Sequence, residues 1–388
     1  MENQELERAR EQLKSTGADW ALLSSAENVT YVSHYEVPID FGPLAHLSYG
    51  PVLALFGVRE AGSALVANSY YAGGARKQTS FDEVFGFDIL QVFEPYTRQA
   101  PRENFLAAVR RALQQAGLGE GRPKLAVEEK NLPLAVVRIL AEEYPNIELV
   151  EATPAVEMAR KVKTGREVEL LKRVAEVVNV GQKEILKQTR QAGKTEFELW
   201  SDATQAMHEY IGGKLFMSGE LVCGPRNKSV APGGPISYVT QPGDLAEFDV
   251  SPRLDGYWAD MANVVVIGAE PTAAQVRYAR AARDSIYSAA AMLRPGKRAS
   301  EVFEAAARAY DKYGLKLGHY VGHGIGTQVN EAPWFVPSDA TVLEAGMVVC
   351  IETGAYGEEA TGKCEKTFVI RDSGEAEIFP DFEWGIKI

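Results

Sequence analysis

The chain has 388 residues and a formal net charge of −12, and its hydrophobic content of 46% is ordinary for a globular protein. The negative charge argues against nucleic acid as a partner and offers no basic anchor for a membrane surface. No apolar run reaches the roughly 18 residues that a bilayer crossing requires. The length predicts two or three domains.

Cysteine usage and the N-terminal segment predict a cytoplasmic protein. Three cysteines, an odd number, lie far apart in the sequence at positions 223, 350 and 364. This suits a reducing compartment better than a disulfide framework. The segment MENQELERAREQLKS is charged from its start and lacks the apolar core of a signal peptide.

The first part of the chain alternates strand and helix patterns, which predicts an α/β domain with a central sheet over residues 1–158. Strand patterns lie at 19–23, 52–56, 63–66, 85–91, 124–127 and 147–150, and helical patterns lie at 4–16, 103–116 and 133–143. The segment Asn28–His46 is aromatic, polar and irregular. We expect it to be an exposed loop, and a plain connection rather than a binding lip.

A second domain is predicted over residues 159–388. Thr153-Pro154 marks a break, and a long amphipathic helix with mixed charges begins at Glu157. Further helical patterns lie at 194–210, 272–292 and 299–314, and a Gly- and Pro-rich stretch at 211–245 suits a loop packed near a site. The tail alternates strands and glycine turns.

The stretch Ala246–Gly268 contains two aspartates, Asp249 and Asp260, in an alternating apolar and polar pattern typical of a strand. Asp255-Gly256 between them is a strong hairpin-turn signal and predicts that the two carboxylates lie side by side on adjacent strands. Two buried carboxylates repel unless a cation compensates them. The stretch alone fits a metal site and a pair of solvated strand-end aspartates equally well.

Three later elements extend this set. The segment 318–326 places His319 and His323 among glycines, which lets backbone or substrate approach closely. Glu352 ends an apolar strand pattern, where a carboxylate is costly to bury unless it is paired or bound to metal. Glu365 begins another strand 13 residues later, a spacing that suits two neighbouring antiparallel strands.

Two aspartates, two glutamates and one histidine carry four formal negative charges, which two divalent cations would balance. Oxygen-rich ligation with one imidazole suits Mn, Fe or Co and allows Zn. Such a pair of ions about 3.5–4 Å apart can bridge a water and polarise a substrate oxygen. The sequence shows no nucleophile-elbow serine, no evident Cys-His pair and no strand-to-helix phosphate loop.

These residues resemble the pita-bread fold family, which includes methionine aminopeptidase, aminopeptidase P, prolidase and creatinase. The resemblance covers residues 159–388, and the first domain resembles the N-terminal domain of the prolidase and creatinase branch. It implies an α+β protein whose catalytic domain is a pseudo-symmetric antiparallel sheet covered by helices. It also implies the metal ligands, in family order: Asp249, Asp260, His323, Glu352 and Glu365.

The chain departs from the family at the positions that contact substrate. The family histidine of the Gly-rich loop is absent, since no histidine lies between His208 and His319. The second family histidine is replaced by Asn330. The other departures are Ala262-Asn263 for Thr-Arg, Glu352-Thr353-Gly354 for Glu-Pro-Gly, and Lys363 for an arginine.

The resemblance implies a metal-dependent hydrolase of a C–N bond, Xaa-Pro peptidase-like, with a metal-bridged hydroxide as nucleophile and Glu352 as proton shuttle. Loss of a donor that stabilises the oxyanion costs about 10²–10³ in rate unless it is replaced. Asn330 can donate a hydrogen bond but supplies no proton, and His319 and His208 are candidate substitutes.

Two other readings remain. The missing histidines favour a non-peptidase enzyme of a small polar metabolite, creatinase-like, ectoine-hydrolase-like or sulfonium-lyase-like. A non-catalytic binding module fits less well, because such a module needs no cluster of four carboxylates.

The resemblance also implies a homodimer. A loop from the partner's first domain often closes the site in this branch. The stretch Tyr35–His46 is the candidate for that loop.

Overall fold

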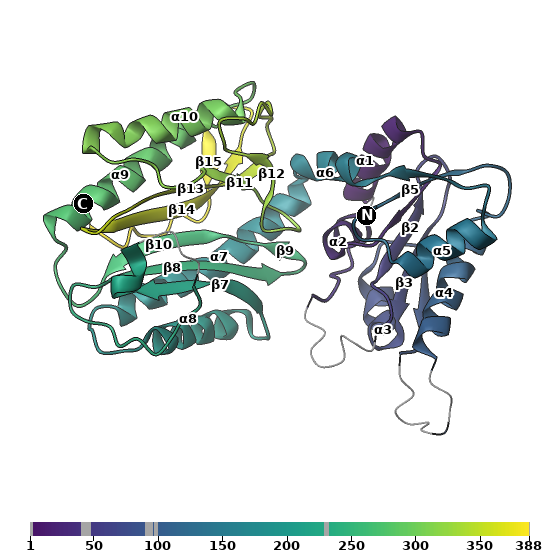
Figure 1. The fold of residues 1–388 in the computed structure, drawn as a ribbon, viewed down its shortest axis with the longest axis horizontal. Helices are drawn as coiled ribbons and strands as arrows, with labels where there is room; N and C mark the ends of the chain where they lie inside the picture. The colour runs from purple at the N-terminus through teal and green to yellow at the C-terminus, as the bar shows by residue number, and fades with distance from the viewer. Residues whose placement is uncertain (1–2, 40–47, 90–95, 97–99, 229–232, 388) are drawn as a thin grey trace. The chain divides into compact units, whose positions relative to one another are not determined.

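The computed structural model describes residues 3–39, 48–89, 96, 100–228 and 233–387 (Figure 1). Its contacts divide the chain into two compact units, Met1–Arg160 and Lys161–Ile388. None of the described helices combines the length and the apolar character that a bilayer crossing needs.

The N-terminal unit is the expected α/β domain, with a six-stranded sheet in the order β4-β3-β2-β1-β5-β6. The strands are β1 Trp20–Leu23, β2 Leu53–Gly57, β3 Ser63–Asn68, β4 Glu83–Phe87, β5 Lys124–Val127 and β6 Glu148–Glu151. The helices are α1 Gln4–Leu13, α2 Ala26–Ser33, α3 Ser69–Gln78, α4 Pro101–Gln115, α5 Leu134–Glu143 and α6 Thr153–Lys161, and a 3-10 turn, Lys14–Thr16, follows α1. One apolar core joins the sheet to α1, α2 and α6, and a second joins it to α4 and α5.

The expectation of an exposed loop at Asn28–His46 is wrong for its first part. Residues up to Ser33 belong to α2, and those from Asn28 to Ser33 are buried. The polar Asn28 is accommodated because its side-chain amide donates to the Glu128 carboxylate at 2.7 Å and its oxygen accepts from Arg160 at 2.7 Å. Residues 40–47 lie outside the described residues.

The boundary region also differs from the expectation of one long helix beginning at Glu157. Thr153-Pro154 opens α6 and does not break the chain, and α6 ends at Lys161. A new helix, α7, spans Gly165–Gln188. Thr164 separates the two helices because its side chain and that of Glu167 form a capping box, which favours a helix start at this position.

The C-terminal unit contains two sheets, ordered β10-β8-β7, with β9 paired to β8, and β12-β11-β13-β14-β15. Their strand pairings among the described residues are all antiparallel. The strands are β7 Phe216–Cys223, β8 Leu245–Leu254, β9 Tyr257–Trp258, β10 Met261–Val266, β11 Gly322–Gly324, β12 Glu331–Trp334, β13 Val348–Tyr356, β14 Thr361–Ile370 and β15 Ala376–Ile378. The remaining helices are α8 Glu196–Ile211, α9 Ala273–Ala290 and α10 Ala299–Ala309, with 3-10 turns at Gly224–Lys228 and Asp311–Tyr313.

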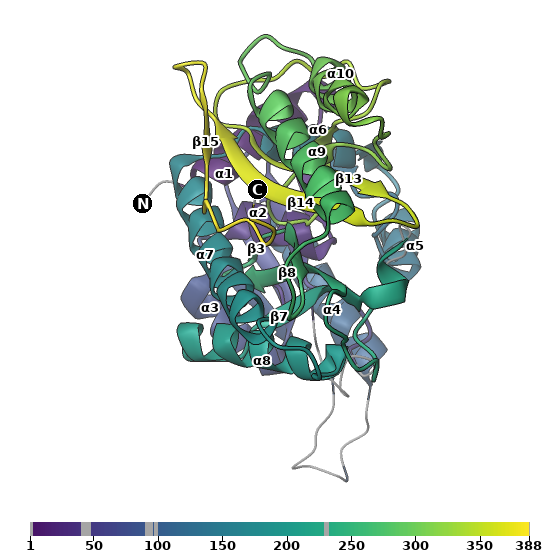
Figure 2. The same cartoon turned by 90° about the vertical axis from the view of Figure 1, so that its left-hand side faces the viewer.

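Each sheet of this unit is covered by its own pair of helices. Buried residues of α7 and α8 pack against β7, β8 and β10, whereas those of α9 and α10 pack against β13 and β14. Strands β14 and β10 lie beside each other where the two halves meet (Figure 1). Figure 2 shows α9 lying over β14, and α7 and α8 beside β7 and β8. This repeated arrangement is the pseudo-symmetric antiparallel sheet with helices on it that the resemblance implied, and the whole chain is α+β.

Gly322 sits where β11 passes closest to β13. Its φ is +128°, and a Cβ atom there would lie 2.0 Å from the carbonyl oxygen of Cys350. A side chain at this position would meet both a steric clash and a backbone conformation that L-residues rarely adopt. Glycine is therefore required directly before His323.

The variant Gly322→Ala should lower the stability of the protein by about 2 kcal/mol or more, because left-handed strain and a backbone clash add. A thermal melt followed by circular dichroism measures this. The matched control is Gly165→Ala, since an added Cβ there meets nothing within 4 Å. The prediction fails if Gly322→Ala melts together with the wild type and with Gly165→Ala.

Candidate metal centre

The predicted hairpin forms and carries both aspartates. Asp255 (φ 51°) and Gly256 (φ 85°) make the turn between β8 and β9, as a tight hairpin loop requires. In the register of β8 with β10, Asp249 pairs with Ala262, so Asp260 lies two residues further along on the same face. The Ser251 hydroxyl donates to Asp260 Oδ1 at 2.8 Å and fixes that carboxylate.

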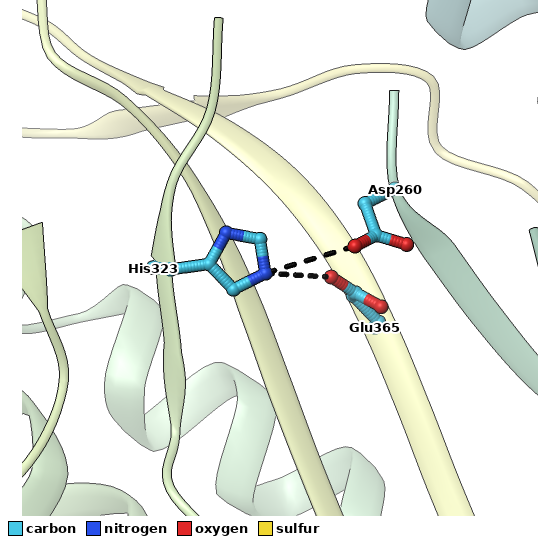
Figure 3. Close-up of side chains that lie close together, drawn as sticks. All are labelled: Asp260, His323 and Glu365. Atoms are coloured by element: carbon cyan, nitrogen blue, oxygen red, sulfur yellow. Dashed lines mark ion pairs between the residues drawn. The ribbon is translucent and has the colours of Figure 1, made fainter. Parts of the chain in front are cut away.

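His323 faces three carboxylates, from β13, β14 and the residue directly before β10. Its Nε2 atom lies 3.7 Å from Asp260 Oδ2, 3.8 Å from Glu365 Oε1 and 3.9 Å from Glu352 Oε1. Figure 3 shows the imidazole from β11 directed at Asp260 and Glu365. Glu352 and Glu365 stand directly opposite each other on β13 and β14. These atoms surround one point without bonding to each other.

The donors at this point fit a divalent cation. His323 Nδ1 lies 2.9 Å from the Gly324 carbonyl oxygen, which can only accept, so Nδ1 carries the proton and Nε2 keeps its lone pair. His323 Nε2 and Glu365 Oε1 are both buried and have no hydrogen-bond partner. An orphaned imidazole nitrogen whose other nitrogen is fixed by a carbonyl is a typical metal ligand.

The pKa shifts of these side chains also favour a bound cation. Burial, and then the charges of neighbouring carboxylates, raise the pKa of Asp260 and of Glu365 well above their ordinary values. Burial also lowers the pKa of His323, which favours its neutral form. Without a cation the site would hold protons on its acids, and a bound divalent ion removes that cost.

A second acidic group lies next to the first. Oxygen atoms of Glu220, Glu247 and Asp249 all lie within 4.8 Å of one another. Lys363 from β14 pairs with Asp249 and lies 3.6 Å from Glu247 Oε1 and 3.8 Å from Glu352 Oε2. Burial opposes the charge of Lys363, but Asp249, Glu247 and Glu352 raise its pKa well above the ordinary value.

The structure thus places the predicted ligands in two adjoining sets. Asp260, Glu352 and Glu365 gather around His323, whereas Asp249 is paired with Lys363. Glu352 belongs to both sets, because its Oε1 faces His323 and its Oε2 faces Lys363. Four of the five predicted ligands, all except His323, line one cavity of about 400 Å³.

The other predicted site residues differ in position. His319 and Asn330 line the same cavity, together with Tyr320 and Tyr356. His319 Nδ1 donates to the Tyr320 carbonyl at 2.6 Å, and its Nε2 has no partner. His208 is not among the lining residues; its Nε2 lies 3.3 Å from the Leu215 carbonyl oxygen.

The loop that presents Asn330 is held by a buried ion pair. Lys163 Nζ lies 2.9 Å from Glu331 Oε2, and both side chains are almost completely buried. The other oxygen of Glu331 accepts from the Gln328 amide at 3.0 Å. The two oxygens of Glu331 therefore hold the loop before β12 in place, one through Lys163 and the other through the Gln328 amide.

The comparison with protein families assigns both units. Residues 169–372 match the metallopeptidase family M24, which is more than half of the chain. The chain belongs to metallopeptidase family M24. Residues 5–162 match the creatinase/prolidase N-terminal domain. This confirms the resemblance to the prolidase and aminopeptidase P branch, and it makes the M24 chain an enzyme, a metal-dependent hydrolase of a class that uses divalent metals.

Individual relatives of the M24 chain are distant. An Xaa-Pro dipeptidase from Lactobacillus helveticus is 28% identical over 241 residues, covering 60% of this chain and 63% of that protein. A creatinase from Bacillus sp. (strain B-0618) is 25% identical over 369 residues, covering 89% and 81%. The crystal structure of a prolidase from Pyrococcus horikoshii OT3 superimposes with a TM-score of 0.78 at 21% identity and covers 99% of both chains, so the fold is shared.

Sequence reasoning missed two acids of this M24 cavity. Glu247 lies two residues before Asp249, so the strand period placed it on the same face and could have revealed it. Glu220 pairs across β7 and β8 with Asp249, a contact between distant segments that no local pattern reports. Burial raises the pKa of Glu247 to about 7 and also raises that of Glu220.

Two departures from the family take on structural roles outside the cavity lining. Ala262 is completely buried in β10. Asn263 donates to the Glu383 carbonyl at 3.0 Å and accepts from the Gly385 amide at 3.0 Å, so it ties down the C-terminal segment.

Replacing a central carboxylate should separate metal affinity from apo stability. Glu365→Gln should weaken manganese binding by at least about tenfold, as loss of even an outer-sphere partner does. The metal-free variant should melt above the metal-free wild type, because a neutral amide removes the cost of burying or protonating this carboxylate. Metal titration and thermal melts with and without a chelator measure both effects.

The control for that prediction is Glu375→Gln, an exposed carboxylate in the turn before β15. It should alter neither quantity. Equal metal affinity in Glu365→Gln and Glu375→Gln would contradict the assignment of Glu365 as a ligand.

Proposed function

We propose that this M24 enzyme hydrolyses the amide bond of Xaa-Pro dipeptides or short peptides, with two divalent cations bound by Asp249, Asp260, His323, Glu352 and Glu365. The observation that carries the proposal is the convergence of buried side chains on one point: His323 from β11, Glu352 from β13, Glu365 from β14 and Asp260 directly before β10. Two of their atoms, His323 Nε2 and Glu365 Oε1, have no hydrogen-bond partner. The Xaa-Pro dipeptidase relative and the family membership support this substrate class.

The donor set also bears on which metal binds. Four carboxylates and one imidazole favour Mn, Co or Fe and allow Zn. When bound, such cations act as Lewis acids toward a substrate carbonyl and lower the pKa of a nearby water. To bind a cation, Asp249 would have to leave its ion pair with Lys363. Lys363 would then keep Glu247 as its partner.

Glu352 is the residue best placed to move a proton. Its Oε1 faces His323, while its Oε2 lies 3.9 Å from His319 Nδ1 and 3.8 Å from Lys363 Nζ on the cavity side. A proton held at Oε2 can be delivered to the departing nitrogen of a bound amide. The carboxylate thus joins the metal set to the substrate space.

Three side chains are placed to do the work of the two missing family histidines. His319 Nε2 is an unpartnered acceptor in the cavity wall, and Asn330 offers an amide donor beside it. The Tyr320 hydroxyl, which hydrogen-bonds Glu352, would have to leave that carboxylate to donate to an oxyanion. These groups would orient the substrate carbonyl and the leaving nitrogen.

A second candidate function rests on the same departures. An enzyme acting on a small polar metabolite needs no proline pocket, and the creatinase relative matches 89% of this chain. The acidic wall of Glu220 and Glu247, absent from the expected ligand set, favours a polar substrate. The family membership gives the peptidase proposal more support.

The peptidase proposal predicts release of proline from at least one member of a panel of Xaa-Pro dipeptides when the enzyme is loaded with manganese. A chelator should abolish the activity, and Glu352→Gln should reduce kcat by about 10² or more while leaving a folded protein. Chromatographic detection of free proline measures it. Complete absence of turnover across the panel, with metal bound, would sink the proposal in favour of the metabolite enzyme.

His319 and His208 form a matched pair. His319→Ala should lower kcat by about 10²–10³, because a group that contacts the substrate is lost from a site already short of histidines. His208→Ala should leave kcat unchanged, since His208 is not among the residues that line the cavity and its Nε2 lies 3.3 Å from the Leu215 carbonyl oxygen. Steady-state kinetics on the best substrate of the panel decide it, and equal kcat values in both variants would exclude His319 from the reaction.

We further propose a homodimer in which the partner's stretch Tyr35–His46 closes the site. Within it Tyr35 and Val37 are buried, and residues 40–47 lie outside the described part of the chain. Analytical ultracentrifugation should give twice the mass of the 42.4 kDa chain. A single monomeric species at micromolar concentration would remove the basis for this proposal.

A further inference from the structure

The second acidic group occupies one wall of the metal cavity. Glu220 of β7 stands opposite Asp249 of β8, and Glu247 precedes Asp249 by two residues on the same face. The oxygens of the three side chains lie within 4.8 Å of one another. Of the three, Asp249 and Glu247 have Lys363 as a counter-ion, and Glu220 has no ion-pair partner among the described residues.

The negative charges of the carboxylates that line the cavity outnumber the positive charges that could neutralise them. Six carboxylates line the cavity: Glu220, Glu247, Asp249, Asp260, Glu352 and Glu365. Within the described chain Lys363 is the one Lys or Arg among the lining residues. Two divalent cations together with Lys363 neutralise five of the six charges, and a single divalent cation would neutralise only three. With all six carboxylates ionised and two cations bound, one negative charge remains for a ligand to balance.

Asn227 gives an independent indication of the ligand at this wall. It lines the same cavity and is 3% exposed. Its side-chain amide donates to the Val222 carbonyl at 3.1 Å, which leaves the Oδ1 atom as a buried acceptor with no partner. A buried acceptor without a partner is costly, so this position favours a ligand that brings its own N–H donors.

We propose that Glu220, Glu247 and Asn227 form a subsite for a protonated amine of the substrate. The subsite rests on the proposed function, because it places this amine beside the amide to be cleaved. The wall offers acceptors in the form of two carboxylates and an amide oxygen, so it selects a cation with N–H groups over a quaternary one. In an Xaa-Pro substrate the amine is either the α-ammonium or a basic side chain of Xaa.

Binding of uncleavable amino acids tests the subsite without any peptidase activity. L-norleucine and hexanoic acid differ only in the α-ammonium, and L-lysine and L-norleucine differ only in the side-chain ammonium. Calorimetric titration of the manganese-loaded enzyme should show at least about tenfold tighter binding of the amine in one of these pairs, as a charge-assisted hydrogen bond gives. The pair that shows the preference identifies which amine is bound.

Two variants and a control test whether Glu220 and Glu247 cause the preference for the amine. Glu220→Gln and Glu247→Gln should each reduce it by about tenfold at unchanged manganese content. Glu358→Gln removes the same charge from a side chain that is 88% exposed and should leave the preference intact. If the side-chain ammonium is the bound group, Nε-trimethyl-L-lysine should bind no better than L-norleucine.

The outcomes against the proposal are equally distinct. Amine binding that is the same in wild type, Glu220→Gln and Glu247→Gln would overturn it. Loss of bound manganese from the two variants would instead make these residues metal ligands and would also overturn it. A lack of Xaa-Pro hydrolysis alone would leave these binding results unaffected, so the two proposals fail separately.

Discussion

The C-terminal unit depends on keeping several like charges together away from water. Glu352 and Glu365 stand directly opposite each other on β13 and β14, an arrangement of like charges that destabilises a strand pair. Asp260 adds a third carboxylate, and His323 points an unpartnered nitrogen at the group. Strand pairing supplies the geometry, and either protonation of the acids or a bound cation would compensate the repulsion. The antiparallel sheets and the helices packed on them hold these carboxylates close together.

The cavity next to this group combines all the carboxylates of the predicted ligand set with surroundings that depart from the family pattern. Asn263 binds the C-terminal segment, and Asn330 lines the cavity at the position where the resemblance implies a histidine. Acidic side chains on β7 and β8 add negative charge that the ligand set does not require. The residues expected to bind metal and the residues expected to contact the substrate are thus separate features of the sequence. This separation explains why membership in the family fixes the reaction class more firmly than the substrate.

Local signals predicted much of the fold and most of the carboxylates that gather around His323. Asp255-Gly256 predicted the hairpin because such a pair adopts the turn conformation at little cost, and the 13-residue spacing of Glu352 and Glu365 predicted their pairing. The buried helix at Ala26–Ser33 was missed because its polar Asn28 is satisfied by the distant Glu128. Glu220 was missed for the same physical reason, since only the pairing of β7 with β8 brings it to the site. Interactions between distant segments carry no signature in either segment alone.

The direct pairing of Glu352 with Glu365 has a consequence for how the protein reaches its native state. Side chains alternate between the two faces of a strand, so a slip of one residue between β13 and β14 would turn one carboxylate away from His323. A chain with that slip would keep its backbone hydrogen bonds but could not assemble the ligand set. A divalent cation held by these residues would therefore stabilise only the chain in which β13 and β14 pair in the native register.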